Sequence, residues 1–429
     1  MSLLIVVCWA ALQPSEILTF SAPFMAMRKA LTPLLGALAL GWMGFSVLLA
    51  LRPVVLEQSI GGLDKLFRVH KWAGITSVFL VVSHWLLILS PRTLMAWGWI
   101  ETVVRAKRPH GSGGASLIGL AKEMGEWSAW IMIALGIVAL LRFVPYDWFR
   151  KLHKGFSVAF LIGAYHSVVL LPENSTGTPF GLLVWGIALA GSFISLQSLI
   201  GMVGRSRRHD GKVERVTVTP SGIVDLHIKL NVGWPGHRAG QFVLLTLDRK
   251  EGAHPFSIVS EWRPEARLRF AIKPLGDYTR TLAERVRVGD AVSVEGPYGR
   301  FDFGDVGEDQ VWVAGGIGIA PFVARLEGLA ATGAAKGRIH FFYSAKNTFD
   351  AAFPEGLEVL CKRAGVELHR HIDSVDGLLD TEQIGRFALH SKGLWFCGPA
   401  PWAKALKAAL RSRYGLSASS FHHEVFEFR

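Results

Sequence analysis

Cysteine is scarce in this chain of 429 residues. Only Cys8, Cys361 and Cys397 occur, which is too few for a disulfide framework or for a metal site built from four thiolates. We therefore expect the soluble part of the chain to face a reducing cytoplasm. The sequence also contains no internal repeat and no low-complexity tract, so nothing in it indicates a repeat architecture.

The start of the chain lacks the marks of a signal peptide. Residues 2–12 are apolar, but no basic segment precedes them and no small-residue cleavage site follows them. We interpret them as a short or truncated first membrane span rather than as a cleaved signal.

Acidic residues are outnumbered, because 34 Asp and Glu stand against 46 Lys and Arg, for a formal charge of +12. Half of the residues are hydrophobic, yet 19% are charged, which is typical of a chain that is part membrane-embedded and part soluble. The basic excess is then best explained by cations beside membrane spans and by sites for phosphorylated cofactors, not by nucleic acid binding.

Apolar blocks with short breaks fill the chain up to about residue 204. Most approach the ~20 residues that a spanning helix needs, and they cover 3–12, 31–51, 69–89, 127–141, 152–171 and 180–203. We therefore predict six spans, of which the first and fourth are short.

Cations cluster between blocks two and three, between four and five, and after six, so the positive-inside rule places those loops in the cytoplasm. The long loop 90–126 also carries cations, but the rule weakens for long loops.

The pattern changes after residue 204. Short alternating segments predict a small antiparallel barrel, and they lie at 213–218, 224–230, 241–247, 267–272 and 291–295. After residue 304 strands alternate with helices, which is typical of a parallel α/β nucleotide domain. The predicted fold is a membrane α-helical bundle (1–204), a β-barrel flavin domain (205–304) and an α/β parallel-sheet nucleotide domain (305–429).

Four histidines lie in the apolar blocks: His70 and His84 in the third, and His153 and His166 in the fifth. Ionisable residues at membrane depth are rare and usually functional. One block separates the two helices, so they run parallel. His70 then pairs with His153 near the cytoplasmic end, and His84 pairs with His166 deeper in the membrane. Two haems with imidazole ligands, stacked across the bilayer, fit this pattern.

The spacing within each helix adds a condition. The 14 residues between His70 and His84 span about 21 Å and return to nearly the same helix face. The 13 residues between His153 and His166 do not return to the same helix face. The two-haem interpretation therefore requires a kink or a π-turn in the fifth block.

Other interpretations of the histidines stay open. Each imidazole could simply hydrogen-bond to a neighbouring helix. A zinc or di-iron site would need ligands at one depth, often with carboxylates, and the blocks supply no Asp or Glu near the histidines. Arg68, Lys71 and Lys154 could hold haem propionates, or could be ordinary flanking cations.

Three segments of the expected barrel together indicate a flavin site: GQF (240–242), HPFSI (254–258) and KPLGDYTR (273–280). A flavin needs an apolar wall, donors at the ring edge and a cation for its pyrophosphate. Suitable side chains are those of Phe256, Ser257, Lys273 and Thr279, although each segment alone could be an ordinary strand end.

A glycine-rich turn between a strand and a helix indicates a nucleotide site. Gly315, Gly316 and Gly318 would let the backbone approach a pyrophosphate, and Pro321 opens the helix. Cys397, Gly398 and Pro399 end a later strand, where a nicotinamide could meet the flavin, although a buried cysteine before a turn would look the same. Ser344 and Lys346 could hold a 2′-phosphate, which would favour NADPH.

These motifs resemble a known family over nearly the whole chain. The first part is similar to the ferric-reductase-type transmembrane domain, and the second is similar to ferredoxin–NADP reductase. Together they resemble bacterial NADPH oxidases and ferric reductases. The two histidine pairs, HPFSI, IKPLGDYT, GGIGIAP, FCGP and the ending HEVFEFR carry the resemblance.

The resemblance implies roles for single residues. His70, His84, His153 and His166 would be bis-histidine ligands of two haem b irons, and the 13-residue spacing belongs to the family pattern. FAD would be bound by His254, Pro255, Phe256, Ser257, Lys273, Gly276 and Thr279. NADPH (or NADH) would be bound by the glycine loop and Cys397. Phe426 would cover the flavin ring until nicotinamide displaces it, with Phe428 a weaker candidate.

The implied enzyme is a multi-pass protein of the inner (cytoplasmic) membrane, with its FAD and NADPH domains in the cytoplasm. It would pass electrons from NADPH to an extracytoplasmic acceptor, with oxygen first and superoxide as product. A ferric-chelate reductase, and an electron-transfer subunit serving a partner protein or a quinone, are the alternatives. We expect no nucleic acid partner.

Overall fold

The structure is a computed structural model, and it describes residues 1–100, 117–141, 144–231, 233–249, 251–301, 303–304, 308–333, 335–351 and 356–424. The chain divides into two compact units, residues 1–60 with 65–203 and residues 61–64 with 204–429. The further boundary near residue 304, between flavin and nucleotide domains, stays a prediction.

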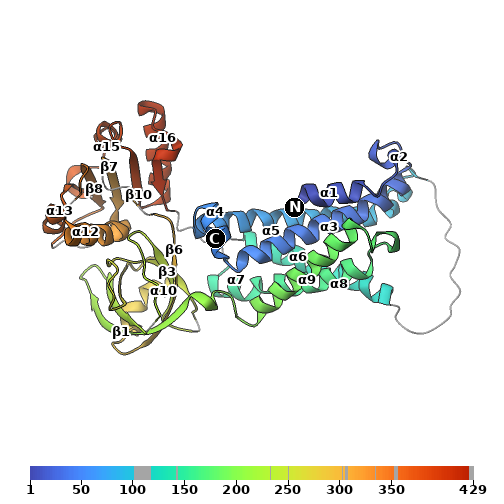
Figure 1. Ribbon diagram of the computed structural model, residues 1–429, viewed down its shortest axis with the longest axis horizontal. Helices are drawn as coiled ribbons and strands as arrows, with labels where there is room; N and C mark the ends of the chain where they lie inside the picture. Colours follow the sequence, from blue (N-terminus) through green and yellow to red (C-terminus); the bar gives the residue numbers. More distant parts are fainter. Residues whose placement is uncertain are drawn as a thin grey trace. The chain divides into compact units, whose positions relative to one another are not determined.

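The first unit is helical (Figure 1). Its α-helices are α1 (Ser2–Ala10), α2 (Ser15–Leu18), α3 (Phe24–Ala50), α4 (Val54–Ile60), α5 (Leu63–Ala96), α6 (Leu117–Leu140), α7 (Tyr146–His153), α8 (Gly155–Val169) and α9 (Pro179–Leu199). Helix α8 packs against α3, α6 and α9. Its small residues Ala159 and Ala164 allow this close approach and are buried together with Phe160.

Four helices in the described part of the chain are long and apolar enough to cross a membrane: α3, α5, α6 and α9. The predicted fourth span was too short, because helix α6 begins at Leu117 and includes charged residues that a hydropathy pattern leaves out. The predicted count of six spans is not confirmed. Helix α1 has 9 residues and α8 has 15, and both fall short of the ~20 residues that a straight span needs.

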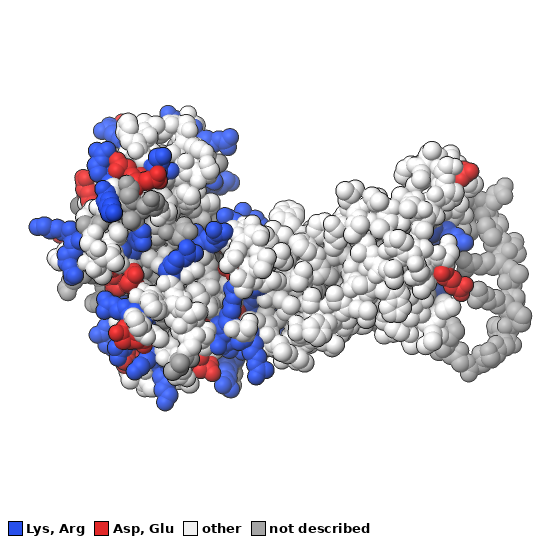
Figure 2. Space-filling view, in the orientation of Figure 1, with Lys and Arg blue, Asp and Glu red and all other residues white. Residues whose placement is uncertain are grey.

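Charged side chains are distributed unevenly over the first unit. Figure 2 shows a long helical surface almost free of Lys, Arg, Asp and Glu, with charges at its ends. Many large apolar side chains of the helices in this unit are exposed, for example Phe79, Leu189 and Phe193. A surface of this kind is unfavourable in water and suits the hydrocarbon core of a bilayer.

The second unit begins with an antiparallel sheet whose strand order is β4-β3-β6-β1-β2-β5. Its strands are β1 (Arg208–Val218), β2 (Val224–Leu230), β3 (Phe242–Thr246), β4 (His254–Ser257), β5 (Arg267–Ile272) and β6 (Ala291–Tyr298). The two outer strands approach each other, and Val259 N–H donates to Arg269 O at 2.8 Å just beyond β4. The sheet is therefore a nearly closed barrel, as predicted, around a core that includes Val224, Leu245 and Phe270.

A parallel sheet follows, with strand order β11-β10-β7-β8-β9. Its strands are β7 (Gln310–Gly315), β8 (Ile339–Ala345), β9 (Val366–Ile372), β10 (Gly393–Cys397) and β11 (Phe421–His423). The helices α12 (Ala320–Thr332), α13 (Leu357–Ala364), α15 (Thr381–Ala388) and α16 (Ala400–Tyr414) connect and cover them. This confirms the predicted α/β class, whereas the short edge strand β11 was not predicted.

Candidate functional site

The four membrane histidines come from three helices. His70 and His84 lie on the single helix α5, whereas His153 is the last residue of α7 and His166 lies on α8. The helix is interrupted between α7 and α8 at Lys154. This interruption lies where the 13-residue spacing requires a change of helical phase.

The structure brings the histidines together in two pairs. The ring centroids of His70 and His153 are 5.9 Å apart, and those of His84 and His166 are 6.2 Å apart. Imidazole nitrogens bind metals at about 2 Å, so two rings that share one metal have centroids about 6 Å apart. Both pairs have the separation that a shared iron requires.

Three of the four imidazoles are oriented by backbone carbonyl groups. His70 Nδ1 donates to Ser46 O at 2.9 Å, and His84 Nδ1 donates to Thr32 O at 3.0 Å. His166 Nδ1 donates to Ala121 O at 2.8 Å. A histidine whose Nδ1 carries the proton presents a basic Nε2, which is the arrangement that second-shell contacts give to metal ligands.

The fourth imidazole differs from the others. His153 Nδ1 is buried and has no hydrogen-bond partner among the residues that the structure describes. The rings of Phe149 and Phe156 lie on either side of it in sequence, each with its centroid 5.0 Å from that of the imidazole. Packing against aromatic rings, rather than a carbonyl acceptor, holds this side chain.

Two glycines make room for the deeper pair. A Cβ on Gly125 of α6 would lie 2.1 Å from His166 Nδ1, and a Cβ on Gly36 of α3 would lie 3.3 Å from His84 Cε1. Gly125 is one turn beyond Ala121, whose carbonyl accepts the His166 proton. The backbone of α6 therefore lies flat against this imidazole. No motif in the sequence pointed to either glycine.

Three cations accompany the other pair in sequence. Arg68 and Lys71 are within two residues of His70, and Lys154 follows His153. All three side chains are exposed, so they are available to an anionic group at this end of the bundle. Propionate binding by them stays a prediction.

The predicted flavin residues gather at one edge of the barrel. In the pairing of β3 with β4, Ser257 lies opposite Phe242 and Phe256 lies opposite Val243. The rings of His254 and Tyr278 stack at 4.1 Å with an interplanar angle of 8°, which links the HPFS strand to the KPLGDYT segment. The structure thus brings all three predicted flavin segments together, and Gln241 Nε2 of the GQF segment donates to Gly299 O at 3.3 Å.

The KPLGDYT segment folds around one hydroxyl. Thr279 Oγ1 accepts from the N–H groups of Leu275 and Gly276 at 3.0 and 2.9 Å, which fixes the turn before the short helix α10 (Asp277–Arg280). Lys273 Nζ forms an ion pair with Asp350 Oδ1 at 2.9 Å. This cation is therefore engaged with a carboxylate in the structure, so a flavin pyrophosphate would have to share it.

Tyr278 is a residue of this region that sequence reasoning did not select. Its hydroxyl is buried without a hydrogen-bond partner among the described residues. Burial first, and then Glu251 and Asp248, raise the pKa of Tyr278 to about 12. The hydroxyl therefore keeps its proton at neutral pH and could donate it to a ligand that enters the site.

The two nucleotide motifs meet at the ends of adjacent strands. Strands β7 and β10 pair in parallel, with Ala314 opposite Cys397. A Cβ on Gly318 would lie 2.3 Å from Cys397 O, and one on Gly315 would lie 2.9 Å from Pro399 Cδ. Gly316 has a φ of +55°, which favours glycine. Only glycines allow the loop to approach the FCGP turn this closely, and Pro321 is the second residue of α12, which begins at Ala320.

The residues predicted to hold a 2′-phosphate have different surroundings. Ser344 is buried, and its Oγ donates to Asp373 Oδ1 at 2.8 Å. Lys346 is exposed at the same end of β8. Asp373 was not selected from the sequence, although an acidic residue at the end of a strand is a known partner for a ribose hydroxyl.

Cys397 is a neutral thiol. Burial and the nearby Glu424 raise its pKa, so it is not a thiolate nucleophile. Glu424 is another residue that was not selected from the sequence, and burial raises its own pKa well above the usual range. Its Oε2 has no hydrogen-bond partner among the described residues. Phe426 and Phe428, the predicted aromatic covers, lie outside the described residues.

Comparisons with known proteins agree with both parts of the fold. Residues 35–164 match the family described as the ferric reductase like transmembrane component, and residues 209–302 match an FAD-binding domain. The fusion of a ferric-reductase-like membrane part with a flavin-binding reductase part, which the sequence predicted by resemblance, is thereby confirmed.

Similar curated proteins are reductases and flavohaemoproteins. The chain is 26% identical to the toluate 1,2-dioxygenase electron transfer component of Pseudomonas putida, over 44% of this chain and 58% of that one. It is 32% identical to the phenol 2-monooxygenase reductase component of a Pseudomonas species, over 34% and 42%. It is 27% identical to the flavohemoprotein of Bordetella pertussis, over 37% and 44%. The chain spans about half the length of the curated relatives it matches.

Similar solved structures include a flavohemoglobin from Malassezia yamatoensis, at 16% identity and a TM-score of 0.49, covering 94% of this chain and 97% of that one. Another is the FAD/NAD-binding domain of nitric oxide dioxygenase from Vibrio cholerae, at 18% identity and a TM-score of 0.44, covering 51% and 98%.

Proposed function

Because this membrane-bound oxidoreductase joins a ferric-reductase-like transmembrane component to an FAD-binding reductase domain, we propose that it transfers electrons across a membrane. The donor is NADPH, the carriers are FAD and two b-type haems, and the acceptor lies outside the cytoplasm. When bound, FAD would accept a hydride and release single electrons that haem relays.

The two histidine pairs carry the proposal. Each pair offers two imidazoles at a separation of 5.9 or 6.2 Å, and three of the four Nδ1 atoms donate to carbonyl oxygens, leaving Nε2 for a metal. The donor set therefore fits haem iron. Among the described residues, neither pair includes a carboxylate ligand, which argues against the di-iron alternative.

The bundle also orders the two pairs. Helix α9 packs against α8 and follows it through a short connection, so α9 returns to the end of the bundle at which His70 and His153 lie. The chain leaves the bundle there. We assign this end to the cytoplasmic face of an inner membrane, in keeping with Arg68, Lys71 and Lys154. His84 and His166 then belong to the outer half.

The flavin residues have distinct tasks in this proposal. Phe256 and Ser257, on the end strand β4, would supply an apolar wall and a hydroxyl donor. Thr279 holds the turn that presents the backbone of Gly276, and His254 orients Tyr278 by stacking. The buried hydroxyl of Tyr278 is available as a further donor.

For the dinucleotide, the loop at Gly315, Gly316 and Gly318 would bind the pyrophosphate at the start of α12. Cys397, buried and neutral, would pack against the nicotinamide, with Gly398 and Pro399 shaping the turn. Lys346 would bind the 2′-phosphate of NADPH. Phe426 keeps its proposed role as the cover of the flavin ring.

NADH is a second candidate donor, favoured by one observation. The carboxylate of Asp373 lies 2.8 Å from Ser344 Oγ, where it would repel a 2′-phosphate but could accept a hydrogen bond from a ribose 2′-hydroxyl. The balance between Lys346 and Asp373 decides which cofactor is preferred.

The way in which the electron acceptor is reduced is inferred from the histidine ligands of the two irons. Since each pair supplies two imidazoles to one iron, no coordination position stays open for a substrate, and reduction would occur at the haem edge. Oxygen, which would give superoxide, is our first choice. A ferric chelate, or a partner protein or quinone, are the alternatives.

The test is turnover of the purified protein with NADPH and each acceptor. Trapped superoxide that matches NADPH consumption supports the oxidase. Fast anaerobic reduction of a ferric chelate with little superoxide would support the reductase instead, and little turnover with either would point to a partner. His84→Ala protein is the control, because superoxide that survives this change comes from the flavin or from the remaining haem and not from the complete route across the membrane.

A further inference from the structure

A cluster of three possible metal ligands lies in the second unit, away from the motifs described above. It consists of His340 on β8 and of Glu367 and His369 on β9. His340 Nδ1 is 3.2 Å from His369 Nε2 and 3.2 Å from Glu367 Oε2, and His369 Nε2 is 3.5 Å from Glu367 Oε1.

The strand register explains why these side chains meet. In the parallel pairing of β8 with β9, His340 lies opposite Glu367, and Phe342 lies opposite His369. Because side chains alternate along a strand, Glu367 and His369 share one face of β9. Strand β9 is the edge of the sheet, so water and ions reach this face from the side.

The distances fit one metal ion. Zinc binds imidazole nitrogen and carboxylate oxygen at about 2.0–2.2 Å, and tetrahedral ligands at that radius lie about 3.4 Å from one another. The two imidazole nitrogens are 3.2 Å apart, and each has one oxygen of the Glu367 carboxylate near this value, Oε2 at 3.2 Å from His340 and Oε1 at 3.5 Å from His369. We propose that His340, Glu367 and His369 bind a divalent transition metal of the zinc class, with water at the fourth position.

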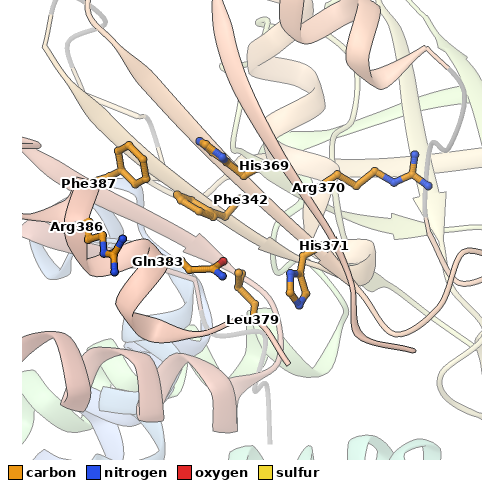
Figure 3. A pocket seen from close by; sticks show the side chains of 8 residues that line it. All are labelled: Phe342, His369, Arg370, His371, Leu379, Gln383, Arg386 and Phe387. Carbon is orange, nitrogen blue, oxygen red and sulfur yellow. The ribbon is translucent and has the colours of Figure 1, made fainter. Parts of the chain in front are cut away.

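The surroundings are suited to such a site. The ring of Phe387 on α15 lies 4.0 Å from that of His340, and Phe342 stacks on His369 at 4.4 Å. These contacts restrict the imidazoles, while Glu367 is 62% exposed and free to adjust. His369 also borders a cavity of about 270 Å³ that Phe387 and Gln383 help to line (Figure 3).

The metal would not take part in electron transfer. His340 is near the start of β8, whereas the nucleotide residues Ser344 and Lys346 are at its end. The site would instead join the edge strand β9 to β8 and stabilise the parallel sheet. Metal removal should therefore leave NADPH oxidation by a soluble dye unchanged at moderate temperature.

The experiment uses the purified full-length holoenzyme, free of any histidine tag and dialysed against EDTA, which does not extract haem iron. Zinc binding is measured by equilibrium dialysis at buffered Zn²⁺ concentrations, with elemental analysis of zinc. We expect one zinc per chain, and an affinity lowered about 100-fold or more in His340→Gln, His369→Gln and Glu367→Gln proteins, since even outer-shell changes weaken binding 10–100-fold.

The matched control is His371→Gln. His371 lies two residues beyond His369 on the same face of β9, but its Nε2 contacts Gly377 O at 2.7 Å and not the cluster. This variant should bind zinc as the wild type does. Substoichiometric zinc in the wild type, or an equal loss in the control, would show that the cluster is only a hydrogen-bond network. Because Glu367 is exposed, the Glu367→Gln change should not disturb folding. The flavin absorbance of each variant shows whether the protein is folded.

Discussion

The imidazoles of His84 and His166 face each other from α5 and α8 with ring centroids 6.2 Å apart and planes at 88°. Each ring is tied by Nδ1 to a different helix, His84 to Thr32 of α3 and His166 to Ala121 of α6. Four helices thus converge on one pair of Nε2 atoms. Such convergence is expected when second-shell contacts orient two ligands of one metal.

Removal of one ligand from this pair should empty one haem site and spare the other. In His84→Ala protein the haem content should fall to about half, and transfer to an external acceptor should stop. Reduction of FAD by NADPH should continue, because His84 is not part of the flavin or nucleotide sites. Haem per flavin, and dye reduction by NADPH, measure the two effects.

Ser83→Ala is the matched control for this change. Ser83 is the neighbour of His84 on α5, is half-buried, and donates to Phe79 O of its own helix at 2.9 Å. Its haem content should equal that of the wild type. Retention of both haems in His84→Ala protein would remove His84 from the ligand set.

Substitution of Gly125 should lower the haem content as much as substitution of a histidine ligand does. An alanine Cβ at this position would overlap His166 Nδ1 at 2.1 Å, so the ring must leave its carbonyl acceptor. We expect Gly125→Ala to lose the His84/His166 haem, although alanine in a helix is otherwise favoured over glycine by about 1 kcal/mol.

The control for Gly125→Ala is Gly186→Ala on α9, where no atom lies within 4 Å of the added Cβ. That protein should keep both haems and be slightly more stable to heat. Equal haem content in the two variants would show that the flat contact with α6 does not position His166.

The buried cysteines should respond to pH in a defined direction. Burial raises the pKa of Cys361 to about 12 and also raises that of Cys397, whereas an unfolded thiol has a pKa of about 8.5. The folded state therefore keeps protons that the unfolded state loses. Below about pH 8.5 the ionisation of these thiols does not change the free energy of unfolding. As pH rises further, it lowers the free energy of unfolding by up to about 1.4 kcal/mol per pH unit and thiol.

Alkylation gives a direct readout of the same shift. At pH 8.5 the partly exposed Cys8 should react with iodoacetamide first, and Cys361 and Cys397 should react at least about 100-fold more slowly, because the thiolate is the nucleophile. All three should react alike in denaturant. Rapid labelling of Cys397 in the folded protein would contradict its burial as a neutral thiol.

Cofactor preference should depend on two opposite charges at the end of β8. Lys346→Glu should lower kcat/KM for NADPH by about 10–100-fold, the equivalent of one charge-assisted contact of about 1.5–3 kcal/mol, with a smaller effect on NADH. Asp373→Asn should shift preference toward NADPH, because it removes the negative charge beside Ser344. Equal losses with both nucleotides would exclude Lys346 from the phosphate site.

The sequence predicted the parts of this fold that local pattern determines. Alternating apolar and polar residues predicted the barrel strands, and the alternation of strands with helices predicted the parallel sheet. The positions of His70, His84, His153 and His166 in the apolar blocks predicted the two pairs. The need for a helix interruption near His153 also followed from the spacing, since 13 residues cannot return an ideal helix to one face.

The residues that were missed depend on contacts between distant segments. Gly125 matters only because α6 lies against His166, 41 positions away in the chain, and Tyr278 became visible only when its ring was found on His254. Asp373 and the His340 cluster depend on strand register, which no single segment encodes. The length of α6 was underestimated because charged residues in its first turns interrupt the hydropathy pattern.

The proposed electron route requires two irons held between the paired histidines. Haem b and flavin should be quantified together in the purified wild-type protein, by pyridine haemochrome spectra and by released FAD. We expect two haem b per FAD, falling to one in His84→Ala protein. A protein that contains flavin but no haem would contradict it.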